Sequence, residues 1–101
     1  MFEGFLNHGL PRIAREKDLL DVRLNDFRQY ADDRRGTVDD RPYGGGAGMV
    51  LMCGPIFKAV ESIEAKSVDG QKPLRIMLSP QGQKLTQTLV EQLAREAWIL
   101  L

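Results

Sequence analysis

The apolar positions at the start of the chain recur at steps of three and four residues, which is the spacing of one buried helical face. These positions are Phe2, Phe5, Leu6, Leu10, Ile13 and Ala14. Gly9 and Pro11 interrupt the pattern. Proline is tolerated at the start of a helix, because its missing N–H would be unpaired there anyway. We therefore expect two short helices, the second beginning near Pro11.

The middle of the chain changes its period twice. Leu20, Val22 and Leu24 alternate with polar residues, which predicts a strand. Residues 26–48 show no period, and apolar residues then return at helical steps from Met49 to Ile63. This pattern predicts a helix that ends in the turn-forming segment SVDGQKP, residues 67–73.

The last third of the chain reads as strand, helix and strand. The apolar run LRIML, residues 74–78, is followed by Ser79, Pro80 and Gly82, which end a strand. Thr86 can cap a helix that continues to Ala94, and residues 98–101 read as a further strand. Alternating helices and strands predict an α/β fold, here a partial parallel sheet with flanking helices.

Composition limits the classes of function. A chain of 101 residues is one small domain, and its 14 basic and 14 acidic residues leave no net charge to attract RNA or an anionic membrane. Any contact with RNA must therefore be local. With no run of about 18 apolar residues, we expect a soluble, cytoplasmic protein with no membrane span. Cys53 lies among apolar neighbours in VLMCGPIF, so we expect a buried, inert thiol, and we expect no metal site.

A second feature is the glycine-rich stretch RRGTVDDRPYGGGAGM, Arg34 to Met49. Glycine is used where the backbone needs a positive φ or approaches a ligand closely. Neither of two familiar phosphate-binding loops fits, because Met49 follows Gly48 where a lysine or a further glycine would be required. The stretch is either a mobile surface loop, over about residues 32–48, or a ligand loop.

The turn LSPQG, residues 78–82, has the same two interpretations. In open α/β sheets, ligands bind beyond the carboxyl ends of the strands, and this turn lies at such an end. Proline and glycine are also ordinary turn residues, so a plain connection between strand and helix would use them too.

The two segments together resemble a known family. GTVDDRPYGGGAGM, then an apolar helix, then IMLSPQGQKLTQ about thirty residues later, look like the N-terminal half of the bacterial tRNA (guanine-N1)-methyltransferases. The resemblance covers nearly the whole chain. It implies the N-terminal part of a SPOUT-class α/β domain, a class with a C-terminal trefoil knot. It also implies a homodimer that methylates N1 of the guanine 3′ of the anticodon in tRNA.

The resemblance also implies binding residues. S-adenosylmethionine is expected to be the methyl donor, held by Met77, Leu78, Ser79, Pro80, Gln81 and Gly82. The tRNA substrate is expected at Arg41, Tyr43, Gly44, Gly45, Gly46 and Gly48. Arg34, Arg35 and Arg41 are candidate phosphate contacts, and a solvated loop neutralised by neighbouring aspartates is the alternative.

The departures from the family pattern limit the expected activity. An N-terminal strand and a C-terminal glycine-rich loop of the family have no counterpart in these 101 residues, and neither has the knot. No aspartate matches the family's base, since Asp39 and Asp40 belong to the loop motif, so no catalytic residue is assigned. We expect a single incomplete methyltransferase domain over residues 1–101 that is inactive alone. The alternative is a non-catalytic module for binding tRNA, cofactor or another chain.

Overall fold

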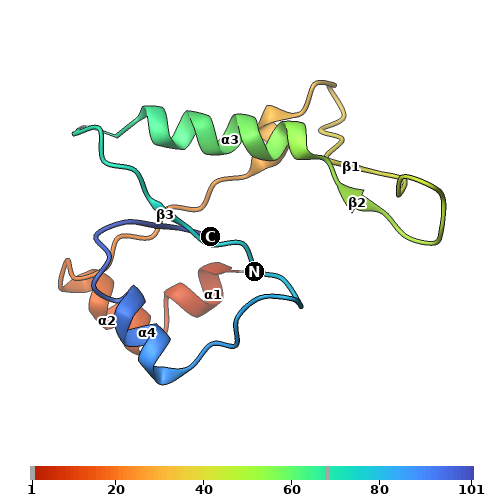
Figure 1. The fold of residues 1–101 in the computed structure, drawn as a ribbon. Coiled ribbons are helices and arrows are strands. Elements are labelled where there is room, and N and C mark those ends of the chain that lie inside the picture. The colour runs from red at the N-terminus through yellow and green to blue at the C-terminus, as the bar shows by residue number, and fades with distance from the viewer. Residues whose placement is uncertain (1, 68) are drawn as a thin grey trace.

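The structure is a computed structural model that describes residues 2–67 and 69–101 of the chain. It has short helices and two small two-stranded sheets, connected by long irregular segments (Figure 1). The elements are α1 (Phe2–Leu6), α2 (Gly9–Glu16), the 3₁₀ helix η1 (Phe27–Tyr30), β1 (Asp39–Asp40), β2 (Val50–Leu51), α3 (Cys53–Ala65), β3 (Leu74–Arg75), α4 (Gln87–Leu93) and β4 (Ile99–Leu100).

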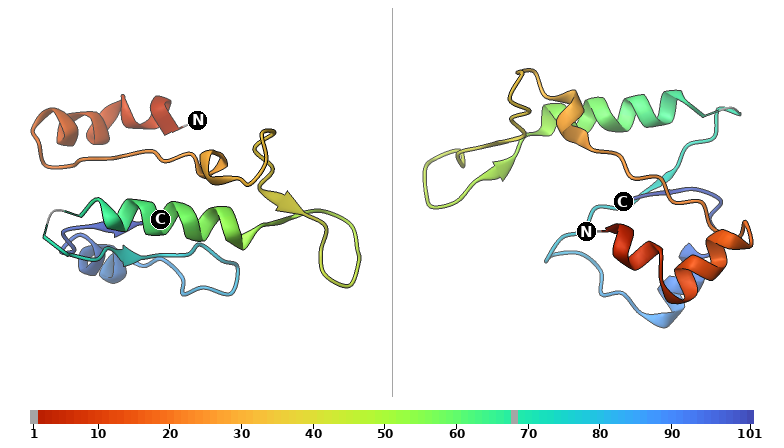
Figure 2. Two further views of the ribbon diagram at one scale, coloured as in Figure 1. Left: turned by 90° about the horizontal axis from the view of Figure 1, so that it is seen from above. Right: turned by 180° about the vertical axis from the view of Figure 1, so that it is seen from behind.

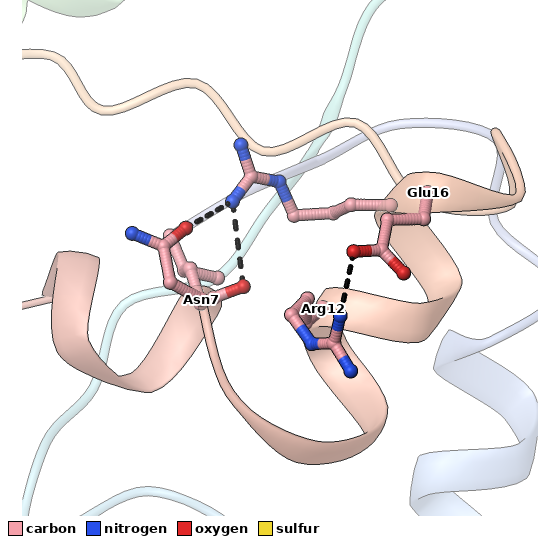
Figure 3. Close-up of polar contacts among 5 residues, drawn as sticks. Asn7, Arg12 and Glu16 are labelled. Atoms are coloured by element: carbon pink, nitrogen blue, oxygen red, sulfur yellow. Dashed lines mark hydrogen bonds and ion pairs between the residues drawn. The ribbon is translucent and has the colours of Figure 1, made fainter.

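The two N-terminal helices confirm the prediction from the apolar spacing, with α2 beginning two residues before Pro11. The Arg15 guanidinium joins them: it donates to the Leu6 carbonyl at 3.3 Å and to Asn7 Oδ1 at 3.0 Å (Figure 3). Within α2, Arg12 donates to Glu16 at 2.8 Å. Side chains of α2 therefore fix the bend between α1 and α2.

The 3₁₀ helix η1 packs against α3, although its residues show no periodic pattern of apolar positions. Asp26 caps η1, because its carboxylate accepts a hydrogen bond from the Arg28 N–H at 3.0 Å. The Tyr30 hydroxyl then donates to Ser62 Oγ on α3 at 3.1 Å. An ion pair between Asp32, which follows η1, and Lys58 adds a second link to α3.

The helix predicted from Met49 was wrong at its start. Val50 and Leu51 form β2, which pairs antiparallel with β1, and α3 begins only at Cys53. Backbone pairing with residues 38–40 takes precedence here over the helical apolar spacing, as the Met52 N–H donates to the Val38 carbonyl at 2.7 Å. Pro55 lies in the first turn of α3, where its missing N–H costs no helical hydrogen bond.

The parallel arrangement at the C-terminal end is confirmed. β3 and β4 pair in parallel, with Leu74 opposite Ile99. The connection between them contains α4, and the Thr86 hydroxyl caps this helix by accepting from the Leu89 N–H at 3.2 Å. Both strands are shorter than predicted, because the backbone ladder ends with the Ile76 N–H donating to the Leu100 carbonyl.

The strand predicted over Leu20–Leu24 was also wrong. These residues are extended, but the described part of the chain offers them no ladder partner, and a strand is defined by its pairing. The turn predicted over residues 67–73 includes Val68, which lies outside the described residues. Its described part has the turn character expected, with Gly70 at a φ of 66°.

The elements form two parts. Residues 26–66 contain η1, the β1–β2 hairpin and α3, and this part lies above β3 and β4 in Figure 1. The remaining helices belong to the other part; α2 and α4 overlap in that view but lie on opposite sides when seen from above (Figure 2). Among the described residues, one pair makes the polar contacts between the two parts: Arg75 donates to Glu64 at 2.6 Å and 2.7 Å.

Little apolar surface is buried. The buried apolar side chains of the described residues are Leu6, Val38 and Ala59, and the prolines Pro55 and Pro73 are buried as well. The accessible surface is 9225 Å², whereas a folded monomer of this mass is expected to expose about 5,800 Å². The Cα radius of gyration is 16.4 Å, against about 13 Å for a compact domain of this length. The apolar faces of these helices are therefore available for further contacts.

We expect the isolated chain to self-associate, because exposed phenylalanine and leucine side chains gain free energy when they are removed from water. Sedimentation velocity over a series of concentrations should show species heavier than 11.4 kDa that increase with concentration. A single monomer boundary at high concentration would contradict this prediction.

We also expect the stability of the fold to depend on the ionisation of Glu64. The hydrogen bonds from Arg75 lower the pKa of Glu64 below its ordinary value of 4.5, so this contribution is complete above that pH and is lost as the pH falls through the lowered pKa. Urea midpoints measured by Trp98 fluorescence should therefore fall below about pH 4.5. In Glu64→Gln, the part of this fall in the urea midpoint that comes from Glu64 should be absent. In the matched variant Glu61→Gln, on the same helix, that part should remain.

Candidate functional site

The glycine-rich stretch forms the tip of a hairpin, here called the glycine arm and defined as residues 41–49. Its base is the β1–β2 pair, with Asp39 opposite Leu51 and Asp40 opposite Val50. Val38, only 1% exposed, anchors one side of the base beneath α3. The arm extends from the α3 end of the molecule in every view (Figures 1 and 2).

The glycines of the arm are required by backbone conformation. Gly44, Gly45, Gly46 and Gly48 have φ angles of 86°, 83°, 123° and 98°, which side-chain-bearing residues rarely adopt. A Cβ added at any of them would meet no atom within 4 Å. In this structure a larger residue would therefore strain the backbone without clashing, and the space around the arm is open to a ligand.

The predicted substrate residues all lie in this one loop. Arg41 precedes, and Tyr43 lies within, the turn in which the Gly45 N–H donates to the Pro42 carbonyl at 3.1 Å. Both side chains are exposed, and Tyr43 has no part of its ring covered. The arm thus presents an aromatic face, a guanidinium and bare backbone together.

Two aspartates near the arm, Asp32 and Asp33, form contacts with residues outside it. Thr37 donates to Asp33 from its hydroxyl at 2.6 Å and its N–H at 2.8 Å, and these bonds lower the pKa of Asp33. Asp32 pairs with Lys58. Within residues 2–67 and 69–101, no carboxylate forms an ion pair with the three candidate arginines, Arg34, Arg35 and Arg41. Their charges are therefore available to phosphate groups.

The second candidate element is the serine-proline turn, defined as residues 77–82, which follows β3. The Gly82 N–H donates to the Ser79 carbonyl at 2.9 Å, and the Gln81 N–H donates to Ser79 Oγ at 3.2 Å. A Cβ on residue 82 would lie 3.0 Å from the Ser79 oxygen, so glycine is required for this turn to close. Met77 and Leu78 begin the serine-proline turn, with 90% and 81% of their surface exposed.

The two elements reach the same end of the molecule, the arm from the part containing α3 and the turn from β3 (Figures 1 and 2). No hydrogen bond joins them in the part of the chain that the structure describes. Each predicted set of residues is therefore gathered within its own loop, and the two sets face a common side without touching.

The expectation of a buried thiol was wrong: Cys53 is exposed. It begins α3 beside the hairpin, and the apolar neighbours that suggested burial, Val50, Leu51 and Phe57, are exposed too. Sequence reasoning also missed the Tyr30–Ser62 and Glu64–Arg75 contacts. The Asp26 cap before two aromatics spaced three residues apart was a usable signal for the first, whereas no pattern pointed to the second.

Two open cavities of about 450 Å³ and 470 Å³ lie beside Arg15, away from both loops. Within the described residues, no group of histidine, cysteine or acidic side chains is arranged to hold a metal ion. No helix there has the length and apolar character needed to cross a membrane. The glycine arm and the serine-proline turn thus remain the candidate site.

Comparisons with known proteins show which family the chain resembles along its whole length. The sequence profile of the family described as tRNA (Guanine-1)-methyltransferase TrmD matches residues 1–101. A tRNA (guanine-N(1)-)-methyltransferase of Geobacillus kaustophilus is 48% identical over 101 residues, which are 100% of this chain and 40% of that protein. The enzyme of the same name from Bacillus subtilis is 46% identical over 100 residues, covering 99% of this chain and 40% of that protein.

The fold agrees with the sequence. The crystal structure of the tRNA (m1G37) methyltransferase from Aquifex aeolicus superimposes with a TM-score of 0.84 at 35% identity, over 97% of this chain and 43% of that one. The α/β fold class is therefore confirmed. The chain spans about two fifths of the length of the relatives it matches. With a family profile matching from its first residue to its last, the chain belongs to the tRNA (guanine-1)-methyltransferase family.

Proposed function

We propose that this chain supplies the glycine arm and one wall of the donor site of an S-adenosylmethionine-dependent tRNA (guanine-N1)-methyltransferase. The observation that carries the proposal is that the two motifs, separated by about thirty residues, reach the same open side of the molecule. A methyl transfer needs its donor and its acceptor base held beside each other, and two such loops can provide that.

The serine-proline turn fits one side of an adenosyl group. Met77 and Leu78 offer exposed apolar surface for a purine ring, and the closed turn after them holds the backbone in one conformation. When bound, S-adenosylmethionine would supply an electrophilic methyl group on a sulfonium. Because Met77 and Leu78 are so exposed, this chain alone encloses little of such a ligand, and binding by the chain alone should be weak.

The glycine arm suits an extruded guanine and its flanking phosphates. An unpaired base can stack on an aromatic ring, and Tyr43 is free to provide one. The guanidiniums of Arg34, Arg35 and Arg41 can donate to phosphate oxygens, since no aspartate of the described residues forms an ion pair with them. Glycine at four positions of positive φ lets the backbone approach a base without side chains between them.

The proposal assigns binding and orientation to these residues, and no catalytic base. Removal of the proton from N1 needs a positioned base, and Asp39 and Asp40 lie in the base of the hairpin rather than at its tip. The exposed apolar faces supply surface for the homodimer that the family resemblance implies. The enzyme would act on tRNA in the cytoplasm.

The test is a chimera in which this chain replaces the matching 101 residues of the G. kaustophilus relative. We expect the chimera to transfer methyl groups from S-adenosylmethionine to a tRNA with guanine at the target position, and the isolated chain to show no turnover. Gly45→Ala and Pro80→Ala should each lower kcat/KM by about 100-fold, because small displacements of reacting groups cost that much.

Gly54→Ala is the matched control for Gly45→Ala. Gly54 lies in the first turn of α3 with no positive φ and no atom within 4 Å of an added Cβ, so its substitution should leave turnover unchanged. Robust turnover by the isolated chain, or normal activity of both loop variants, would disprove the assignment.

We further propose that the loop expected to be mobile, over about residues 32–48, is most mobile at the glycine arm. Residues 33–38 are held by the Asp33–Thr37 bonds and by burial of Val38, whereas the arm has few contacts to offset the entropy of ordering it. Amide order parameters should be lowest in the arm and rise when tRNA binds the chimera. Uniformly rigid amides without ligand would contradict this.

A further inference from the structure

The contact between Glu64 and Arg75 is unlike the other ion pairs of the described residues. Its guanidinium donates two hydrogen bonds to one carboxylate, Nε to Oε1 at 2.6 Å and Nη2 to Oε2 at 2.7 Å. The Glu64 side chain is only 15% exposed, and that of Arg75 is 60% exposed. A two-point contact fixes the angle between its partners as well as their distance.

The pair also lies at the joint between the two halves of the candidate site. Glu64 is in the last turn of α3, the helix whose first residue follows the β1–β2 hairpin. Arg75 is in β3, two residues before the serine-proline turn begins. The covalent link between them contains Gly70 at a φ of 66° and no helix or strand in its described part, so the chain connection alone leaves their relative orientation free.

We propose that Glu64 and Arg75 act as positioning residues that set the base of the glycine arm at a fixed distance from the serine-proline turn. One ion pair on a surface normally adds little stability. Here its effect is on geometry, because no other side-chain polar contact of the described residues joins the two parts. The strength of the pairing is consistent with this role, since Arg75 lowers the pKa of Glu64 and Glu64 raises that of Arg75.

The identity of the ligands at the two loops rests on the proposed function. The distance between the two parts can be measured without any assay of activity. Cys53 is exposed at the start of α3 and is the one cysteine of the chain. With Gln83→Cys, one residue beyond the turn, it gives two sites for spin labels. Double electron–electron resonance then reports the distribution of distances between the two parts.

We expect a narrow distribution in the otherwise unchanged chain and a broad one in Arg75→Ala. Arg75→Lys, which retains the charge and loses the two-point contact, should be intermediate. The distance distribution of the double variant Glu64→Gln/Arg75→Ala should be no broader than that of Arg75→Ala, because the two residues act as one contact. The matched control is Arg12→Ala, which breaks a 2.8 Å ion pair within α2 and should leave the distribution narrow.

A distribution as narrow in Arg75→Ala as in the unchanged chain, with helix content retained by circular dichroism, would overturn the proposal. Equal broadening in Arg12→Ala would overturn it too. If Arg75→Ala loses its helix content, Arg75→Lys decides: broadening in the folded variant supports the proposal and an unchanged width refutes it.

The chimera with the G. kaustophilus relative adds a kinetic readout. Arg75→Lys should lower kcat by roughly tenfold to 100-fold while the KM values for donor and tRNA stay within about twofold, because each loop is intact and only their separation changes. A change confined to KM would overturn the positioning role. An inactive chimera would count against the proposed function alone, since the distance measurement stands apart from it.

Discussion

Burial of apolar side chains fixes little of this fold, because Leu6, Val38 and Ala59 are the buried apolar side chains of the described residues. The hydrophobic effect is non-directional, and here it is concentrated where the hairpin base and α3 meet. Arrangement elsewhere depends on directional contacts: the Arg15 bonds between α1 and α2, the β3–β4 ladder, and Glu64 with Arg75. The chain therefore has locally defined elements and a large apolar surface that remains available.

That division explains how the candidate site is built. The hairpin base is the best-anchored segment, with Val38 buried and the Met52 N–H bonded to the Val38 carbonyl, so the direction in which the arm leaves is fixed. The arm itself has open space around every glycine. A rigid base with an adaptable tip suits a loop that must receive an extruded base, because the entropy of ordering is restricted to a few residues. The serine-proline turn differs, since its own backbone bonds hold it closed before any ligand is present.

The sequence predicted local structure well and pairing poorly, for a physical reason. The helices α1, α2 and α4 and the Thr86 cap follow from spacing and local hydrogen bonding, which residues close in sequence determine. The strand predicted at Leu20–Leu24 and the helix start predicted at Met49 failed because pairing depends on a partner elsewhere in the chain. The two candidate loops could be picked out because their motifs are unusual. Glu64 and Arg75, eleven positions apart across a turn, left no pattern to read.

The glycines of the arm show how conformation and function can impose the same residue for different reasons. In the structure, a positive φ excludes side chains at Gly44, Gly45, Gly46 and Gly48 even though nothing crowds them. If close approach of a ligand were the sole requirement, alanine at an ordinary negative φ would be sufficient. The free arm would then lose less conformational entropy on ordering than it does with glycine. The coincidence of positive φ with open space indicates that these glycines serve the turning of the arm's backbone and not the relief of crowding. Because the free arm has few contacts, most of the entropy of ordering it is lost only when a ligand binds.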